Sequence, residues 1–138
     1  MKSKQLGLAL LLSALVPAMA NAAPVPRYSA ATISTANSTV DLIPTYNASG
    51  GHLDGIQCIF PSNASGASVK LLFNIDGGAQ TNFIIDPTNL EREDNLGGQF
   101  ISGWLPFNLA FSTSLRVQLN NTSLGTATIN CWATWDTL

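Results

Sequence analysis

The alternation of apolar and polar residues over 68–76, broken only at Leu72, constrains the fold of this chain most. Val69, Leu71, Phe73 and Ile75 lie two positions apart, and Lys70, Asn74 and Asp76 lie between or after them. A period of two is the signature of a half-buried β-strand. The Asp-Gly-Gly sequence that follows is a tight-turn signal, so the segment 81–86 is predicted to return as the second strand of a hairpin.

Similar short apolar segments recur along the chain, separated by Gly-, Pro- and Asn-containing turns. They predict strands over 28–35, 39–43 (ended by Pro44), 53–60, 99–107, 115–121 and 126–135. Only 10% of the residues are charged, and no long helical pattern interrupts the strands. This combination is typical of an all-β protein. We therefore expect an antiparallel β-sandwich, jelly-roll-like or immunoglobulin-like, of about eight strands in one domain over 23–138.

The first 22 residues have the pattern of a cleaved export signal. Lys2 and Lys4 precede an apolar stretch from Leu6 to Val16, and small residues follow, with cleavage expected after Ala22 or Ala20. About 11 apolar residues are too few to span a bilayer, which needs roughly 20. The sequence thus predicts a secreted or periplasmic protein whose mature chain is not inserted in a membrane.

The chain has two cysteines, Cys58 and Cys131, 73 positions apart. In an exported protein such a pair predicts a disulfide, which would stabilise the fold by about 4 kcal/mol through the loop it closes. Each cysteine shares the predicted inward face of its strand, so we expect a bridge between distant strands across the core. A metal site is not predicted, because there is neither a CxxC spacing nor a second histidine.

The charge pattern argues against nucleic-acid binding. Residues 23–138 carry four cations against eight acids, a formal net charge of −4, and the cations are scattered along the chain. Nucleic-acid binding requires clustered cations.

No residue set predicts catalysis or a cofactor. The single histidine, His52, has no partner at a recognisable spacing. An acidic run holds Glu91, Glu93 and Asp94, with Asp86 upstream, and 87–98 is predicted to be an exposed loop. It matches no fixed calcium-binding spacing, so a solvated loop and weak Ca²⁺ binding both remain open for 86–95. We expect a protein that is not an enzyme.

Two tryptophans are the candidate binding residues, together with the acidic run. Trp135 shares the face of Cys131, whereas Trp132 lies on the opposite face beside Asn130 and Thr134. Trp104 lies in the predicted strand over 99–107. A tryptophan among amides and hydroxyls suits sugar stacking or a protein contact, and can equally be covered by a neighbouring loop.

Three segments resemble β-sandwich segments of phage tail and virion-associated proteins. They are Gly51-His-Leu-Asp-Gly-Ile56, Val69-Lys-Leu-Leu-Phe-Asn-Ile-Asp-Gly-Gly78 and Leu105-Pro-Phe with Phe111-Ser-Thr-Ser-Leu-Arg-Val117. The resemblance covers about half of the mature chain. It implies a structural or attachment role and supplies no catalytic residues.

These observations predict an exported, non-enzymatic β-sandwich that binds or assembles at the bacterial surface or in the periplasm, with a protein partner or with itself. One alternative is a fimbrial or filament subunit in which the segment 23–35 adds as a strand to a neighbour's sheet. Another is a secreted carbohydrate-binding module or small hydrolase.

Overall fold

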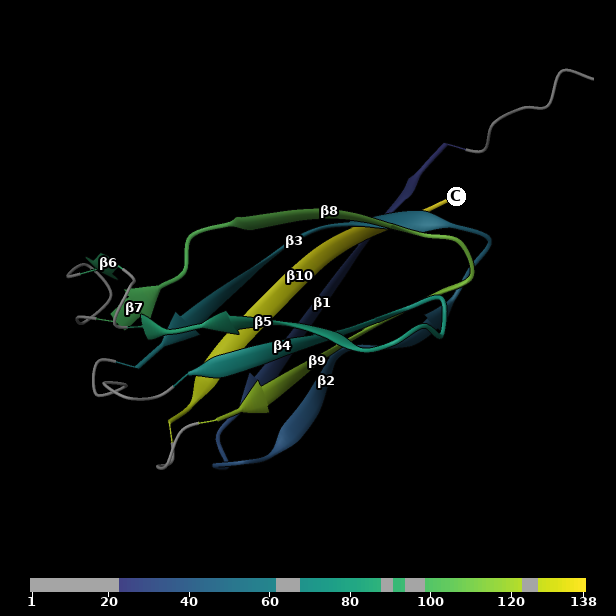
Figure 1. The fold of residues 1–138 in the computed structure, drawn as a ribbon. Helices are drawn as coiled ribbons and strands as arrows, with labels where there is room; N and C mark the ends of the chain where they lie inside the picture. Colours follow the sequence, from purple (N-terminus) through teal and green to yellow (C-terminus); the bar gives the residue numbers. More distant parts are fainter. Residues whose placement is uncertain (1–22, 62–67, 88–90, 94–98, 123–126) are drawn as a thin grey trace, which may run out of the picture.

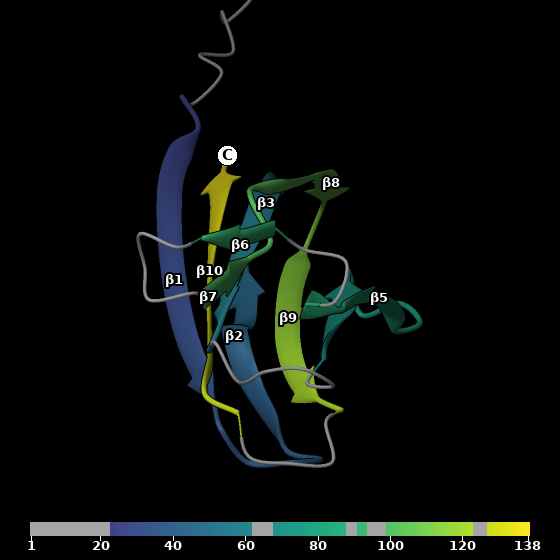
Figure 2. The ribbon, with the colours of Figure 1, turned by 90° about the vertical axis from the view of Figure 1, so that its left-hand side faces the viewer.

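The computed structural model describes residues 23–61, 68–87, 91–93, 99–122 and 127–138. The predicted export signal therefore lies outside the described residues. In these residues ten strands form two antiparallel sheets. The two sheets pack face to face (Figure 1 and Figure 2). The all-β sandwich expected from the sequence is confirmed. Among the described residues, none forms a helix long and apolar enough to cross a lipid bilayer.

The larger sheet has six strands. Their bounds are β1 Val25–Ile33, β10 Ile129–Thr137, β3 Gly51–Phe60, β7 Gln99–Ile101, β6 Glu91–Glu93 and β8 Leu105–Phe111. They are ordered β1-β10-β3-β7-β6, and β8 also pairs with β3. The four-stranded sheet contains β2 Thr39–Asn47, β9 Ser114–Asn121, β4 Val69–Ile75 and β5 Thr81–Ile85, in the order β2-β9-β4-β5.

The connections between the sheets decide between the two sandwich types left open by the sequence. The chain passes from one sheet to the other between β1 and β2, between β2 and β3, and between β3 and β4. It crosses again between β8 and β9 and between β9 and β10, so the first and last strands become neighbours. In an immunoglobulin-like sandwich the first two strands share a sheet. The topology found here is the double Greek key of a jelly roll.

The core lies between the sheets and consists of the residues that the alternation places inward. Leu71 and Phe73 on β4, Leu115, Val117 and Leu119 on β9, and Ile129, Cys131, Ala133 and Trp135 on β10 are all buried. Ile56, Cys58 and Phe60 on β3 are fully buried, while Gln57 and Ile59 between them are partly exposed. The predicted inward faces of these four strands are therefore confirmed.

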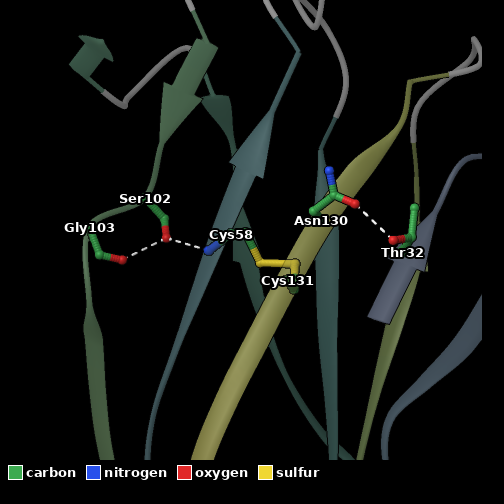
Figure 3. The surroundings of a disulfide bond; sticks show 6 residues. All are labelled: Thr32, Cys58, Ser102, Gly103, Asn130 and Cys131. Atoms are coloured by element: carbon green, nitrogen blue, oxygen red, sulfur yellow. Dashed lines mark hydrogen bonds between the residues drawn. A yellow bond between two sulfur atoms is a disulfide. The ribbon is translucent and has the colours of Figure 1, made fainter. Parts of the chain in front are cut away.

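The predicted disulfide forms, but it does not cross the core. Cys58 and Cys131 lie directly opposite each other on adjacent strands of the same sheet, with 4.1 Å between their Cα atoms. The backbone N–H of Cys58 donates to Ser102 Oγ (Figure 3), and its C=O accepts from Ser102 N–H, so both groups point away from β10. The two cysteines thus occupy a non-hydrogen-bonded pair, the position where antiparallel strands come closest. The sequence identified the partners and their face but not that their strands are neighbours.

Three other expectations are corrected. The segment 99–107, predicted as one strand, is two: β7 and β8 are interrupted at Ser102 and Gly103, where Gly103 has a φ of 65°. The predicted loop over 87–98 contains the short strand β6, which pairs with β7 and shields its edge. Pro44 does not end its strand, because β2 continues to Asn47 and Pro44 sits where the register with β9 shifts. A proline is tolerated there because a residue at a register shift need not donate a backbone N–H hydrogen bond to the neighbouring strand.

Candidate binding surface

The outward side of the six-stranded sheet carries the two candidate tryptophans. Trp132 on β10 lies opposite Ala30 of β1 and Gln57 of β3, on the side facing away from the core. The neighbouring cross-strand row contains Tyr28, Thr134 and Gly55. The outward orientation predicted for Trp132 is confirmed, since it is partly exposed between the buried Cys131 and Ala133.

Trp104 reaches the same side from the connection between β7 and β8. Its indole ring lies so close to Gly55 that a Cβ atom at position 55 would be 2.6 Å from the ring atom Cε2. Only glycine leaves room for this approach. Trp104 remains 44% exposed and Tyr28 66% exposed. The tertiary structure therefore brings together two tryptophans that are 28 positions apart in sequence.

We call this surface the aromatic face. It is defined by Tyr28, Gln57, Trp104, Asn130, Trp132 and Thr134. None of these side chains is charged. Large aromatic groups among uncharged amides and hydroxyls are suited to contact with another protein surface or with a sugar ring.

The acidic candidates lie elsewhere. Glu91 and Glu93 belong to β6, at the far end of the sheet from β1 and separated from β10 by β7 and β3. Asp94 and half of the segment 86–95 lie outside the described residues, so the Ca²⁺ alternative stays a prediction. In the part of the chain that the structure describes, no group of three or more His, Cys, Asp or Glu side chains could hold a metal ion.

His52 pairs with one carboxylate near the end of the sheet. Its Nδ1 is 3.5 Å from Oδ1 of Asp136, and its backbone N–H donates to the same oxygen at 2.8 Å. The histidine side chain is 46% exposed. This contact joins the start of β3 to the end of β10, and so has a structural role.

Among the described residues, Asp76 accepts several hydrogen bonds, although its sequence context predicted only a turn residue. Asp76 adopts a φ of 54° and accepts hydrogen bonds from the backbone N–H groups of Ser112, Thr113 and Ser114. The bonds from Ser114 and Thr113 are the main cause that holds the pKa of this carboxyl well below its usual range; partial desolvation opposes them. The Asp-Gly signal predicted the turn, but nothing in it indicated the second loop that the carboxylate binds.

No protein-family model and no curated protein sequence matches this chain. Its structure is similar to a chain from the acidic stable capsid structure of Helicobacter pylori bacteriophage KHP30, with a TM-score of 0.54 and 17% sequence identity. That match covers 83% of this chain and 88% of the phage chain. A second similar structure is infectious bursal disease virus VP2, with a TM-score of 0.49 and 12% identity, of which this chain spans about a third, 33%.

The expected resemblance to virion proteins is therefore found in the structure as a shared fold. The class that the topology defines is a jelly-roll β-sandwich, the fold that this chain shares with the phage chain. Because the phage match covers most of both chains, the likeness concerns the whole domain rather than one motif.

Proposed function

We propose that this chain is a structural protein, without catalytic activity, that assembles with copies of itself or with other protein subunits through the aromatic face. The observation that carries the proposal is that Trp104, Trp132 and Tyr28 all lie on the outward side of the six-stranded sheet, among uncharged side chains. Exposed aromatic clusters are the centres around which protein interfaces form. The likeness to a phage capsid chain over most of both lengths supports an assembly role.

The proposed location is the periplasm or the bacterial surface. Support comes from the signal-like segment 1–22 and from the disulfide, which persists in oxidising compartments. Expression of the full sequence in a bacterium, followed by fractionation and N-terminal sequencing, tests this. We expect an exported protein beginning at Ala23 or Asn21. Retention of Met1 in the cytoplasmic fraction would refute the location.

The assembly role is tested on residues 23–138 by sedimentation velocity over a range of concentrations. We expect oligomers larger than a dimer in the unaltered protein and their loss in Trp132→Ala. The matched control is Gln118→Ala, because Gln118 is a partly exposed β9 residue on the outward side of the other sheet. Equal assembly by both variants would remove the aromatic face from the proposal.

The strand-addition alternative has a specific structural requirement. The segment proposed as the donated strand is β1, which here pairs with β10 of its own chain over nine residue pairs. A donor strand would have to leave this position and be replaced by that of a neighbour. Loss of oligomers on deleting residues 23–35, with assembly unchanged in Trp132→Ala, would favour this alternative.

Sugar binding is the second candidate for the same surface. Trp132 lies beside Gln57 on the next strand, with Asn130 two residues away on the same side, so an aromatic ring adjoins amide groups. A glycan array probed with the unaltered protein and with Trp132→Ala decides this case. Binding that requires Trp132 would support a lectin-like role. An array without signal would rule out the sugar-binding candidate and leave assembly as the proposed function.

A further inference from the structure

The four-stranded sheet ends at β5, which pairs with β4 and with no other strand among the described residues. Four of its five residues are exposed in succession: Thr81, Asn82, Phe83 and Ile84. Phe83 is 44% exposed and Ile84 56%. An edge strand of this kind presents free backbone groups beside apolar side chains, which is the template for pairing with another strand.

The other sheet edges carry the features that block such pairing. β1 contains Pro26 and Arg27, β2 contains Pro44 with two register shifts, and β8 contains Pro106. The outer strand β6 reads Glu-Arg-Glu. Prolines, charges and bulges are the usual protection of edge strands. β5 has no proline, no charged residue and no register shift with β4.

The direction of the free backbone groups follows from the bonds of β4. Ser68 C=O accepts from Thr122 N–H, and Asp76 N–H donates to Ser114 C=O, so the even-numbered residues of β4 bond β9. The odd-numbered ones, including Leu71, must then bond β5, because backbone groups alternate sides along a strand. Leu71 lies opposite Phe83. The N–H and C=O groups of Asn82 and Ile84 therefore point outward from the sheet edge.

The side chain of Phe83 is only partly covered at the edge of the four-stranded sheet. It lies on the inward side, opposite Leu71, and its ring contacts Phe107 of β8 with 5.6 Å between centroids. Phe107 in turn contacts Phe73 at 4.9 Å. This aromatic cluster bridges the two sheets, yet Phe83 stays 44% exposed, and no described strand lies beyond β5.

We infer that β5 pairs with β5 of a second copy of this chain, antiparallel and about a two-fold axis that passes beside Phe83. In this register Asn82 lies opposite Ile84 of the other copy, and all their outward N–H and C=O groups bond. Phe83 lies opposite its own counterpart in a non-hydrogen-bonded pair, the closest kind, and the two rings cover each other. Such pairing joins two four-stranded sheets into one and closes as a dimer.

We infer a second copy of β5 as the partner strand because the edge of β5 is complementary to itself. β5 carries no charge, so two copies meet without like-charge repulsion, and the outward groups of each strand match in number and spacing. The contact is short compared with a standard protein interface, so the dimer should dissociate on dilution.

The first test compares two substitutions of Ile84 in residues 23–138 by sedimentation equilibrium, from about 10 μM to about 1 mM. Ile84→Pro removes an outward N–H without losing a bond to β4, whereas Ile84→Thr removes the same apolar side chain but keeps the N–H. We expect the dimer dissociation constant to rise about tenfold or more in the proline variant and to stay within about threefold in the threonine variant. Equal effects, or no dimer in the unaltered protein at the highest concentration, would overturn the inference.

The second test measures the register. In Phe83→Cys the new thiols lie opposite each other across the axis, in the same kind of strand position that the native Cys58–Cys131 bridge occupies with 4.1 Å between Cα atoms. In Ile84→Cys the new thiols do not lie opposite each other across the axis. Mild oxidation should cross-link the first variant at least about tenfold faster than the second, seen by non-reducing electrophoresis and peptide mass spectrometry. Comparable rates would contradict the register, and circular dichroism confirms that each variant is folded.

This contact is separate from the aromatic face, which belongs to the other sheet. The dimer should therefore persist in Trp132→Ala. A dimer lost in Trp132→Ala but retained in Ile84→Pro would refute the β5 pairing while supporting the aromatic face, so the two proposals fail independently.

Discussion

The carboxylate of Asp76 accepts hydrogen bonds from both the backbone N–H and the hydroxyl of Thr113, at 2.7 and 3.1 Å. Asp76 lies just after β4, and Thr113 lies in the turn through which β8 of one sheet becomes β9 of the other. The contact thus fixes the connection between the sheets to a hairpin turn that is remote in sequence.

Asp76 should make stability depend on acid. Its pKa in the folded protein lies below the ordinary 3.8, so its contribution is fully present above about pH 4 and is lost as the pH falls further. Asp76→Asn should be less stable than the unaltered protein at pH 7, and its stability should fall less between pH 4 and pH 2. Urea unfolding at several pH values measures both effects. Asp54→Asn, at an exposed carboxylate on β3, is the control, and an identical acid response of the two variants would contradict the role of Asp76.

Removing the disulfide should destabilise the fold substantially. The bridge closes a loop of 73 positions, for which the chain-entropy model gives about 4 kcal/mol. The double variant Cys58→Ala/Cys131→Ala should lose roughly 2 to 4 kcal/mol in urea unfolding while keeping its β-sheet circular dichroism. A loss below about 1 kcal/mol would show that the β3–β10 pairing restrains the chain without the bridge.

Ser102 should matter for stability through one hydrogen bond. Its Oγ accepts from the backbone N–H of Cys58 at 2.9 Å and donates to Gly103 C=O at 2.8 Å (Figure 3). The side chain thereby replaces the ladder bond that is missing where β7 and β8 are interrupted. Ser102→Ala should cost about 1 to 3 kcal/mol, because it leaves the Cys58 N–H without its partner. Ser102→Thr keeps the hydroxyl and should stay close to the unaltered protein; equal losses in the two variants would assign the effect to packing.

Gly55 should be intolerant of a side chain. A Cβ atom there would be 2.6 Å from both the Trp104 ring and the backbone oxygen of Leu105. Gly55→Ala should cost about 1 to 3 kcal/mol and shift the tryptophan fluorescence, as the indole is displaced. In a Trp104→Ala background the same substitution should cost less. An unchanged cost there would show that the clash with Leu105 alone sets the effect.

The parts of the fold that follow from local pattern were predictable. The alternation at Val69 to Ile75 and at Leu115 to Leu119 identified both the strands and their inward faces, because side chains on a strand alternate strictly. The Asp76-Gly77 turn was readable because it needs residues that tolerate positive φ, here 54° and 67°.

The break in the segment 99–107 was not predictable in this way. Ser102 and Gly103 are compatible with a strand or with a turn, and only the pairing of both flanking pieces with β3 selects the interruption. The candidate site shows the same limit: the outward orientation of Trp132 followed from alternation, whereas its convergence with Trp104 depends on the position of Gly55.

By itself the sequence determined where most of the strands lie, which side of them faces the core and which two cysteines pair, since these depend on local periodicity and on there being only two thiols. It missed the short strand β6 and the break between β7 and β8. Apart from the β4–β5 hairpin, which the Asp-Gly turn predicted, only the tertiary structure decided which strands are neighbours. It placed Cys58 and Cys131 within one sheet rather than across the core, gathered the aromatic face, and left β5 at an open edge. The reason is physical: backbone hydrogen bonds are the same for any pair of strands, so the choice of neighbour emerges only when all the inward faces are buried together.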